Sequence, residues 1–84
     1  KMVEDEKIIK ILKALAQVEE DLTVPKNIRE KIKYAIGALQ EQNKETSLKI
    51  DKSLQELDGV SEDPNISSYT RTQVWNIISL LESI

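Results

Sequence analysis

The chain has 84 residues, 12 of them basic and 15 acidic, so its net charge is −3 and does not indicate a protein that binds duplex nucleic acid. Because it contains no cysteine and no histidine, disulfides, zinc sites, thiol nucleophiles and imidazole bases are excluded. No apolar run is long enough to span a bilayer, and no signal-peptide pattern is present. We therefore expect one small cytoplasmic domain over residues 1–84. Its first residue, Lys1, is either native or the remnant of a tag.

The first predicted helix runs from about Val3 to Glu20 and is expected to be the most buried. At 100° per residue its apolar side chains cover an arc of about 180°. They are Ile8, Ile9, Ile11, Leu12, Leu15, Ala16 and Val18. After a short connection, Pro25 fits the first position of a second helix that ends near Glu41. Thr23 or Val24 is the predicted cap of this helix, and Thr23 is the chemically better of the two.

The third predicted helix, about Lys44 to Asp58, follows a polar link that contains Asn43, a candidate cap. It is the weakest helix, and Gly59 predicts a left-handed stop after it. Only three of its residues form a full apolar face: Ile50, Leu54 and Leu57. A turn signature over residues 63–65 precedes the last helix, for which Ser67 or Ser68 is the predicted cap and which continues to about Ser83.

Residues 8–41 match residues 50–83 when the first segment is laid on the second, with ten of 34 positions identical. A period of this length, half of the chain, is typical of helical-hairpin repeats. We therefore predict an all-α fold, an antiparallel four-helix bundle made of two hairpins, about residues 3–41 and 44–83. If the hairpins pack about a pseudo-twofold axis, small residues of the second helix face bulky ones of the fourth. The small residues are Ala35, Gly37 and Ala38, and the bulky ones are Ile77 and Leu80.

Two segments, TVPKNIR at residues 23–29 and YTRTQVWNIISLLES at residues 69–83, resemble the archaeal uncharacterised protein family 0147. The resemblance covers nearly the whole chain, and TRTxVWNIIS is its most specific part. It implies a bundle of bromodomain-like, up-and-down topology in an archaeal cytoplasmic protein with no assigned activity. The family often has a proline at the start of the last helix and a histidine before TRT. This chain has Ser67 and Tyr69 at those places, so the details of the cap can differ.

Both hairpins place loop carboxylates before an arginine that lies one turn into the next helix. The sets are Glu20, Asp21 and Arg29 in the first copy and Glu62, Asp63 and Arg71 in the second. The favoured interpretation is an ion-pair clamp across each connection. The alternative is that the four carboxylates meet and bind Mg²⁺, which would permit a metal-dependent enzyme. We expect no catalytic residue, no metal and no cofactor.

The second copy differs from the first in Trp75, Tyr69 and Leu80, which replace Lys33, Asn27 and Ala38. A lone tryptophan in a small domain most often packs in the core, but tryptophan and arginine at a surface edge also form binding hot spots. We expect a non-enzymatic protein-protein interaction module. Its partner is an unidentified protein or, in a homodimer, a second copy that covers the weak third helix. The candidate surface comprises Tyr69, Arg71, Trp75, Leu80 and Glu82.

The alternative function is an RNA- or ribosome-associated protein that uses the basic edge of the second helix, Lys26, Arg29 and Lys33. Only Tyr34 is available there to stack on a base, and Glu30 lies among the cations. A solvated helix face is the simpler interpretation, so nucleic-acid binding is not expected. Acetyl-lysine binding would rest on fold analogy alone, and the short connections leave no room for a deep loop pocket.

Overall fold

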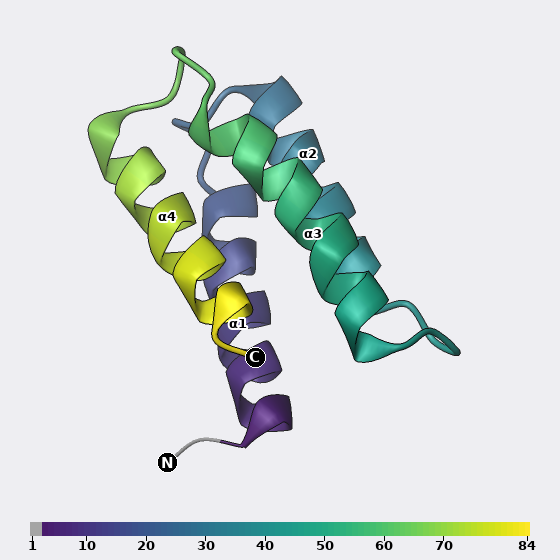
Figure 1. The fold of residues 1–84 in the computed structure, drawn as a ribbon. Helices are drawn as coiled ribbons and strands as arrows, with labels where there is room; N and C mark the ends of the chain where they lie inside the picture. Colours follow the sequence, from purple (N-terminus) through teal and green to yellow (C-terminus); the bar gives the residue numbers. More distant parts are fainter. Residues whose placement is uncertain (1–2) are drawn as a thin grey trace.

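The computed structural model describes residues 3–84, so Lys1 lies outside the described residues. Its four helices are α1 (Glu4–Glu19), α2 (Lys26–Leu39), α3 (Thr46–Ser61) and α4 (Ser68–Glu82). Within the described range there is no strand. Figure 1 shows that successive helices run in opposite directions, with the α1–α2 and α3–α4 connections at one end of the molecule. The prediction of an all-helical fold with four antiparallel helices is confirmed.

Each helix has two neighbours, and helices that lie diagonally opposite have no Cα atoms within 8 Å of each other. Over residues 3–84, α1 contacts α2 and α4, α3 contacts the same two helices, and the most extensive contact joins α2 to α3. The prediction that Ala35, Gly37 and Ala38 of α2 face Ile77 and Leu80 of α4 is therefore wrong. Ser53 of α3 is instead buried against α2, where its hydroxyl donates a hydrogen bond of 3.2 Å to the carbonyl of Ala35. Two small side chains at this crossing let α2 and α3 approach closely.

The core is one cluster with contributions from all four helices and from both hairpin connections. Its buried members are Ile11, Leu15, Val18, Val24, Ile28, Ile32, Ala35, Leu39, Ile50, Leu57, Val60, Ile66, Val74, Ile77 and Leu81. Within each helix these residues recur at the three- and four-residue spacing of one helix face. Ile9 is the exception among the predicted inward residues of α1, because it lies at the far edge of the predicted arc and is 52% exposed.

The predicted end of α3 at Gly59 is wrong, because the helix continues to Ser61. No glycine in the described chain has a positive φ angle. Continuing the helix places Val60 in the core, where it is fully buried, and this gain exceeds the cost of about 1 kcal/mol for a glycine inside a helix. The left-handed residue is instead Asn43, at a φ of 63° in the α2–α3 connection.

The caps of α2 and α4 differ in kind. Thr23 does not cap α2, since the carbonyl of Pro25 accepts the first amide hydrogen bonds of the helix. Ser67 caps α4 as predicted, because its hydroxyl accepts a 3.1 Å hydrogen bond from the amide of Thr70. The α3 cap position is occupied by Glu45 rather than Asn43, without a side-chain hydrogen bond.

The two hairpins have closely matching helix bounds. The shift that pairs residues 8–41 with residues 50–83, extended to the start of α1, also places the two ends of α1 on the two ends of α3. The same pairing places the first residue of α2 on the first residue of α4. Core residues at matching positions are buried in both hairpins, as Val18 and Val60 are. In the part of the chain that the structure describes, no helix is both long and apolar enough to cross a membrane.

Candidate functional site

The outward side of α4 is almost free of charge. We call its exposed residues the α4 face, which comprises Ser68, Tyr69, Thr72, Trp75, Asn76, Ser79 and Glu82. Only Glu82 among them is charged, and the helix as a whole adds only Arg71. In contrast, α2 carries five charged residues, which are Lys26, Arg29, Glu30, Lys31 and Lys33. Depletion of charge and enrichment of aromatic residues distinguish the centre of a protein interface from ordinary surface.

Two aromatic side chains border the α4 face. Tyr69 is 71% exposed and Trp75 is 54% exposed. At 100° per residue they lie on either side of a strip of small polar side chains, which includes Thr72 and Ser79. Trp75 is not a member of the core cluster, so the interpretation that it packs in the core is wrong. Sequence reasoning missed the strip itself, although the absence of charge opposite the apolar side of α4 is visible in the sequence.

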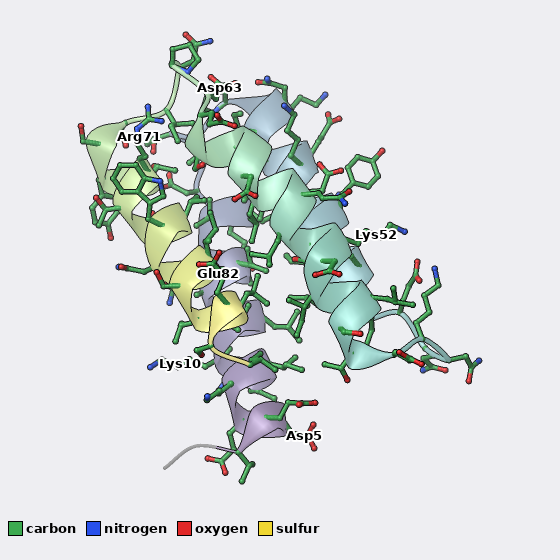
Figure 2. All side chains as sticks on the ribbon, viewed as in Figure 1. Asp5, Lys10, Lys52, Asp63, Arg71 and Glu82 are labelled. Carbon is green, nitrogen blue, oxygen red and sulfur yellow. The ribbon has the colours of Figure 1, made fainter. Side chains whose placement is uncertain are left out.

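The remaining predicted surface residues differ in exposure. Leu80 is partly buried and packs against the core. Glu82 is exposed, and Figure 2 shows it toward the end of α4 opposite to Arg71. The structure therefore places Tyr69, Trp75 and Glu82 on the exposed surface, with Leu80 at its inner edge.

Arg71 is held by the backbone of the α3–α4 connection. Its Nη2 donates hydrogen bonds to the carbonyls of Asp63 (3.0 Å) and Ile66 (3.5 Å), and its Nη1 donates to the carbonyl of Ser61. Figure 2 shows Arg71 and Asp63 at the same end of the molecule. This side chain fixes the end of α3 to the loop that enters α4. Its positive charge lies beside the α4 face, whereas its two terminal nitrogens are bound to the backbone.

The predicted ion-pair clamps do not form, although both arginines lie beside the connections where the clamps were expected. Arg29 also binds a carbonyl, that of Val24, through Nε at 3.1 Å. Over residues 3–84 the ion pairs within 4.0 Å are those of Glu41 with Lys44 (2.8 Å) and Lys52 (3.5 Å). None joins Arg29 to Glu20 or Asp21, and none joins Arg71 to Glu62 or Asp63. The carbonyls of each connection turn toward the arginine, so the guanidinium binds the backbone directly.

The loop aspartates bind their own turns instead. Asp21 accepts hydrogen bonds from the hydroxyl (2.6 Å) and the amide (2.9 Å) of Thr23, and Asp63 accepts one from the amide of Asn65 at 2.8 Å. The Thr23 hydroxyl is the main cause that lowers the pKa of Asp21, and the Thr23 amide and the charge of Arg29 lower it further. Such side-chain bonds to the amide two residues ahead stabilise a turn.

The acidic loops do not gather into a metal site. Among residues 3–84, no group of three or more histidine, cysteine, aspartate or glutamate side chains has an arrangement that could hold a metal ion. The four carboxylates of Glu20, Asp21, Glu62 and Asp63 therefore do not meet as the magnesium alternative requires.

The predicted basic edge lies at a surface hollow of about 360 Å³ over α2. The hollow is lined by Glu19, Lys26, Arg29, Glu30, Lys33 and Tyr34. Three cations and one exposed ring thus come together, but two carboxylates line the same hollow. In the pairing of the two hairpins, Glu30, Lys33 and Tyr34 fall on Thr72, Trp75 and Asn76. At matching positions, one hairpin therefore presents a charged hollow and the other an uncharged aromatic face.

The model of an uncharacterised protein family, UPF0147, matches residues 1–84. A UPF0147 protein of Pyrococcus furiosus is 40% identical over 81 residues, which cover 95% of this chain and 87% of the relative. A UPF0147 protein of Metallosphaera sedula is 37% identical over 78 residues, with 93% and 88% covered.

Two crystal structures are similar over nearly their whole length. The crystal structure of the unknown-function protein MMP1188 has a TM-score of 0.95 at 40% sequence identity. The match covers 100% of this chain and 96% of the MMP1188 chain. That of a UPF0147 protein from Thermoplasma acidophilum has a TM-score of 0.91 at 30% identity, with 95% and 94% covered. The chain therefore belongs to the uncharacterised, mainly archaeal protein family UPF0147.

Proposed function

We propose that this protein is a cytoplasmic, non-enzymatic protein-binding module and that the α4 face is its binding surface. The observation that carries the proposal is the composition of this face, in which Tyr69 and Trp75 are exposed beside side chains without charge. The other three helices each present several charged residues to solvent. A single exposed apolar residue needs no explanation, but two aromatic residues on a face with only one charged residue favour a partner.

The energetics of association agree with this assignment. Tryptophan and tyrosine are enriched among the residues whose truncation costs an interface most. Each ring is large and has few rotatable bonds, so it covers much area at a small entropic cost when a partner binds. Complete burial of one such side chain contributes about 1.5 to 3 kcal/mol. The rings are held on a helix that Arg71 and the Ser67 cap fix at its start, so the surface is preorganised.

We also propose that the bundle has a bromodomain-like topology and is an internal repeat of one helical hairpin. The shared helix bounds support the repeat, and so does the arginine that binds a loop carbonyl in each hairpin: Arg29 binds Val24, and Arg71 binds Ile66. If the hairpins are repeats, the surface of α2 can be compared with that of α4 position by position. The α4 face then differs from its counterpart on α2, because Trp75 occupies the position of Lys33.

The proposal is tested by affinity capture from a lysate of the source organism with three baits: the wild type, Trp75→Ala and Tyr34→Ala. Tyr34 is the matched control, because it is an aromatic residue that is 68% exposed on α2. We expect a protein that the wild type and Tyr34→Ala retain and that Trp75→Ala loses. Circular dichroism verifies that all baits are folded. Equal recovery of every retained protein by the three baits would contradict the assignment of the α4 face.

A second candidate function, RNA association, is favoured by one difference between the arginines. Among residues 3–84, Arg29 donates a hydrogen bond only through Nε, so its two terminal nitrogens remain for a phosphate in the hollow that Lys26 and Lys33 also line. Anisotropy of a labelled single-stranded RNA would test this candidate. Binding that weakens with added salt and is lost in Lys33→Glu would support it, and affinity independent of salt would contradict it, because phosphate contacts release counterions.

A further inference from the structure

The α4 face has the properties of a surface that binds its own copy. We infer that it associates with the α4 face of a second copy as an antiparallel pair of helices, with a twofold axis near Asn76. This inference rests on the proposed function, since it names the partner of the same surface. Three features carry it, which are the spacing of the outward residues, the placement of the two charges and the position of Trp75.

The outward residues follow the spacing of a helix-helix seam. Tyr69, Thr72, Asn76, Ser79 and Ser83 are separated by three, four, three and four residues, the alternation that keeps one strip of a helix against a partner helix. At 100° per residue they lie within an arc of about 80°, directly opposite the buried residues of α4. Thr72 and Ser79 are small enough for two helices to approach closely. In an antiparallel pair, Tyr69 of one copy meets Ser83 of the other, so a large side chain faces a small one at each end.

The two charged residues of α4 select the antiparallel direction. Arg71 lies five residues before Asn76 and Glu82 lies six residues after it, and both are on the Trp75 side of the seam. About a twofold axis at Asn76, Glu82 of one copy is within roughly one residue rise, about 1.5 Å, of the level of Arg71 in the other. Opposite charges therefore meet twice. A parallel pair would put the Trp75 sides of the two copies on opposite flanks of the seam, so neither Arg71 would have a Glu82 of the other copy beside it.

The same symmetry brings the two tryptophans together. A twofold axis perpendicular to two antiparallel helices places the same side of both helices next to each other, so Trp75 of one copy lies beside Trp75 of the other. Both rings then lose much of the exposure that they have in the single chain. Offset or edge-to-face packing of two such rings is favourable beyond their area alone.

The face of α3, where the sequence placed a homodimer contact, is less suited to a second copy. Its exposed Leu48 has charged neighbours, and Asp51, Lys52 and Asp58 extend along the outward side of the helix. Pairing α3 with α3 would desolvate these charges. We therefore place the dimer on α4. One helix pair of this length, about 22 Å, buries less than a standard interface, so we expect a dissociation constant weaker than about 1 µM.

Sedimentation equilibrium and tryptophan fluorescence, measured from micromolar to millimolar concentration, test the inference together. Trp75 is the single tryptophan of the chain, so its emission reports on this contact directly. We expect the mass to rise from one chain toward two and the emission to shift to shorter wavelength over the same concentration range. A wild type that stays monomeric at millimolar concentration, with constant emission, overturns the inference.

Variants locate the contact. Thr72→Arg puts a cation into the seam, and Glu30→Arg, at the matching position of α2, is its control. We expect Thr72→Arg to raise the dissociation constant about tenfold or more, because a long charged side chain would then have to be desolvated between the two helices. Glu30→Arg should leave the dissociation constant unchanged. Ser79→Arg is a second seam variant if Thr72→Arg does not fold. Glu82→Lys should weaken the dimer as well, since it places a cation level with Arg71.

A dimer that persists unchanged in both seam variants overturns the inference. Failure of the dimer inference is distinguishable from failure of the proposed function. A monomeric wild type removes only the second copy as partner, whereas the capture experiment with Trp75→Ala decides whether the α4 face binds any other protein.

Discussion

Arg71 and Arg29 occupy matching positions, but their contacts differ in number. Arg71 donates hydrogen bonds to three carbonyls, one at the end of α3 and two in the α3–α4 connection, and Arg29 donates to one carbonyl of the α1–α2 connection. We predict that Arg71→Ala lowers the free energy of unfolding by about 2 kcal/mol or more, and that Arg29→Ala lowers it by less. Arg71→Lys should not restore the loss, because lysine lacks the planar fork that reaches several acceptors at once. Urea denaturation of the three variants measures this, and equal losses in Arg71→Ala and Arg29→Ala would contradict it.

Asp21 carries a second prediction at this scale. Its pKa is lowered chiefly by the hydrogen bond from the Thr23 hydroxyl, so Thr23→Val should raise that pKa toward its ordinary value. A lowered pKa in the folded state stabilises the fold at pH values above the ordinary pKa of aspartate, which is about 4. That contribution is lost as the pH falls through the lowered value. The stability of Thr23→Val should therefore change less with pH in this acidic window.

Carbon-detected NMR titration of the Asp21 carboxyl measures the pKa in both proteins. Asn65→Ala is the control, because the contact of Asn65 with Asp63 is made by its backbone amide and survives the substitution. An Asp21 pKa that is the same in wild type and Thr23→Val would show that the hydroxyl is not the cause.

The clamp residues show what can be predicted from sequence at the scale of single side chains. The position of each arginine, one turn into a helix and beside a loop, follows from the sequence pattern. The hydrogen-bond partner of the arginine does not follow from the sequence. Charged side chains can be read from the sequence, whereas the direction of a backbone carbonyl depends on how the chain turns. The sequence left Trp75 with two interpretations, core packing and a place on the binding surface, because a position at the edge of an apolar arc is compatible with either. Its exposure in the structure decides against core packing.

Gly59 shows how packing decides the end of an element. In the sequence it has the position of a left-handed stop, but the structure keeps it helical and exposed, with nothing within 4 Å of an added Cβ. We predict that Gly59→Ala raises the free energy of unfolding by about 0.5 to 1 kcal/mol, because alanine has the higher helix propensity and restricts the unfolded chain. Gly37→Ala, also helical and open, should behave alike. Thermal or urea unfolding measures both, and a loss of stability in Gly59→Ala would indicate a left-handed conformation.

The helices themselves were largely predictable, because their apolar faces have a clear period and their starts carry recognisable signals such as Ser67. The end of α3 was not, since the burial of Val60 outweighs the local preference of Gly59. Neither was the contact between α2 and α3 at Ala35. A small side chain shows that some helix can approach closely, but the identity of that helix depends on the buried Ser53 of a different element.

At the scale of the whole molecule, the family and the four-helix architecture followed from the sequence, whereas the arrangement of neighbours did not. The two hairpins are joined into one core, because α2 contacts α3 and α1 contacts α4 in addition to the contacts within each hairpin. Each hairpin alone would therefore expose the core side chains that pack between the two hairpins. In a chain of this size, the stabilisation from buried surface exceeds the cost in conformational entropy by only a small amount. For half of the chain we expect no such excess.

We predict that residues 1–42 and 43–84, prepared as separate peptides, are largely unfolded and that an equimolar mixture regains helix. The division falls in the α2–α3 connection at exposed residues, so it removes no core side chain. Circular dichroism of each half and of the mixture gives the answer, with the intact chain as reference and a mixture containing Leu57→Ala as the control. That substitution opens a cavity in the joint core and should weaken reassembly by about 2 to 5 kcal/mol. A full helical signal in either half alone would contradict the prediction, because it would show that one hairpin has a sufficient core. The contact of α2 with α3 would then be an association of two hairpins that fold independently.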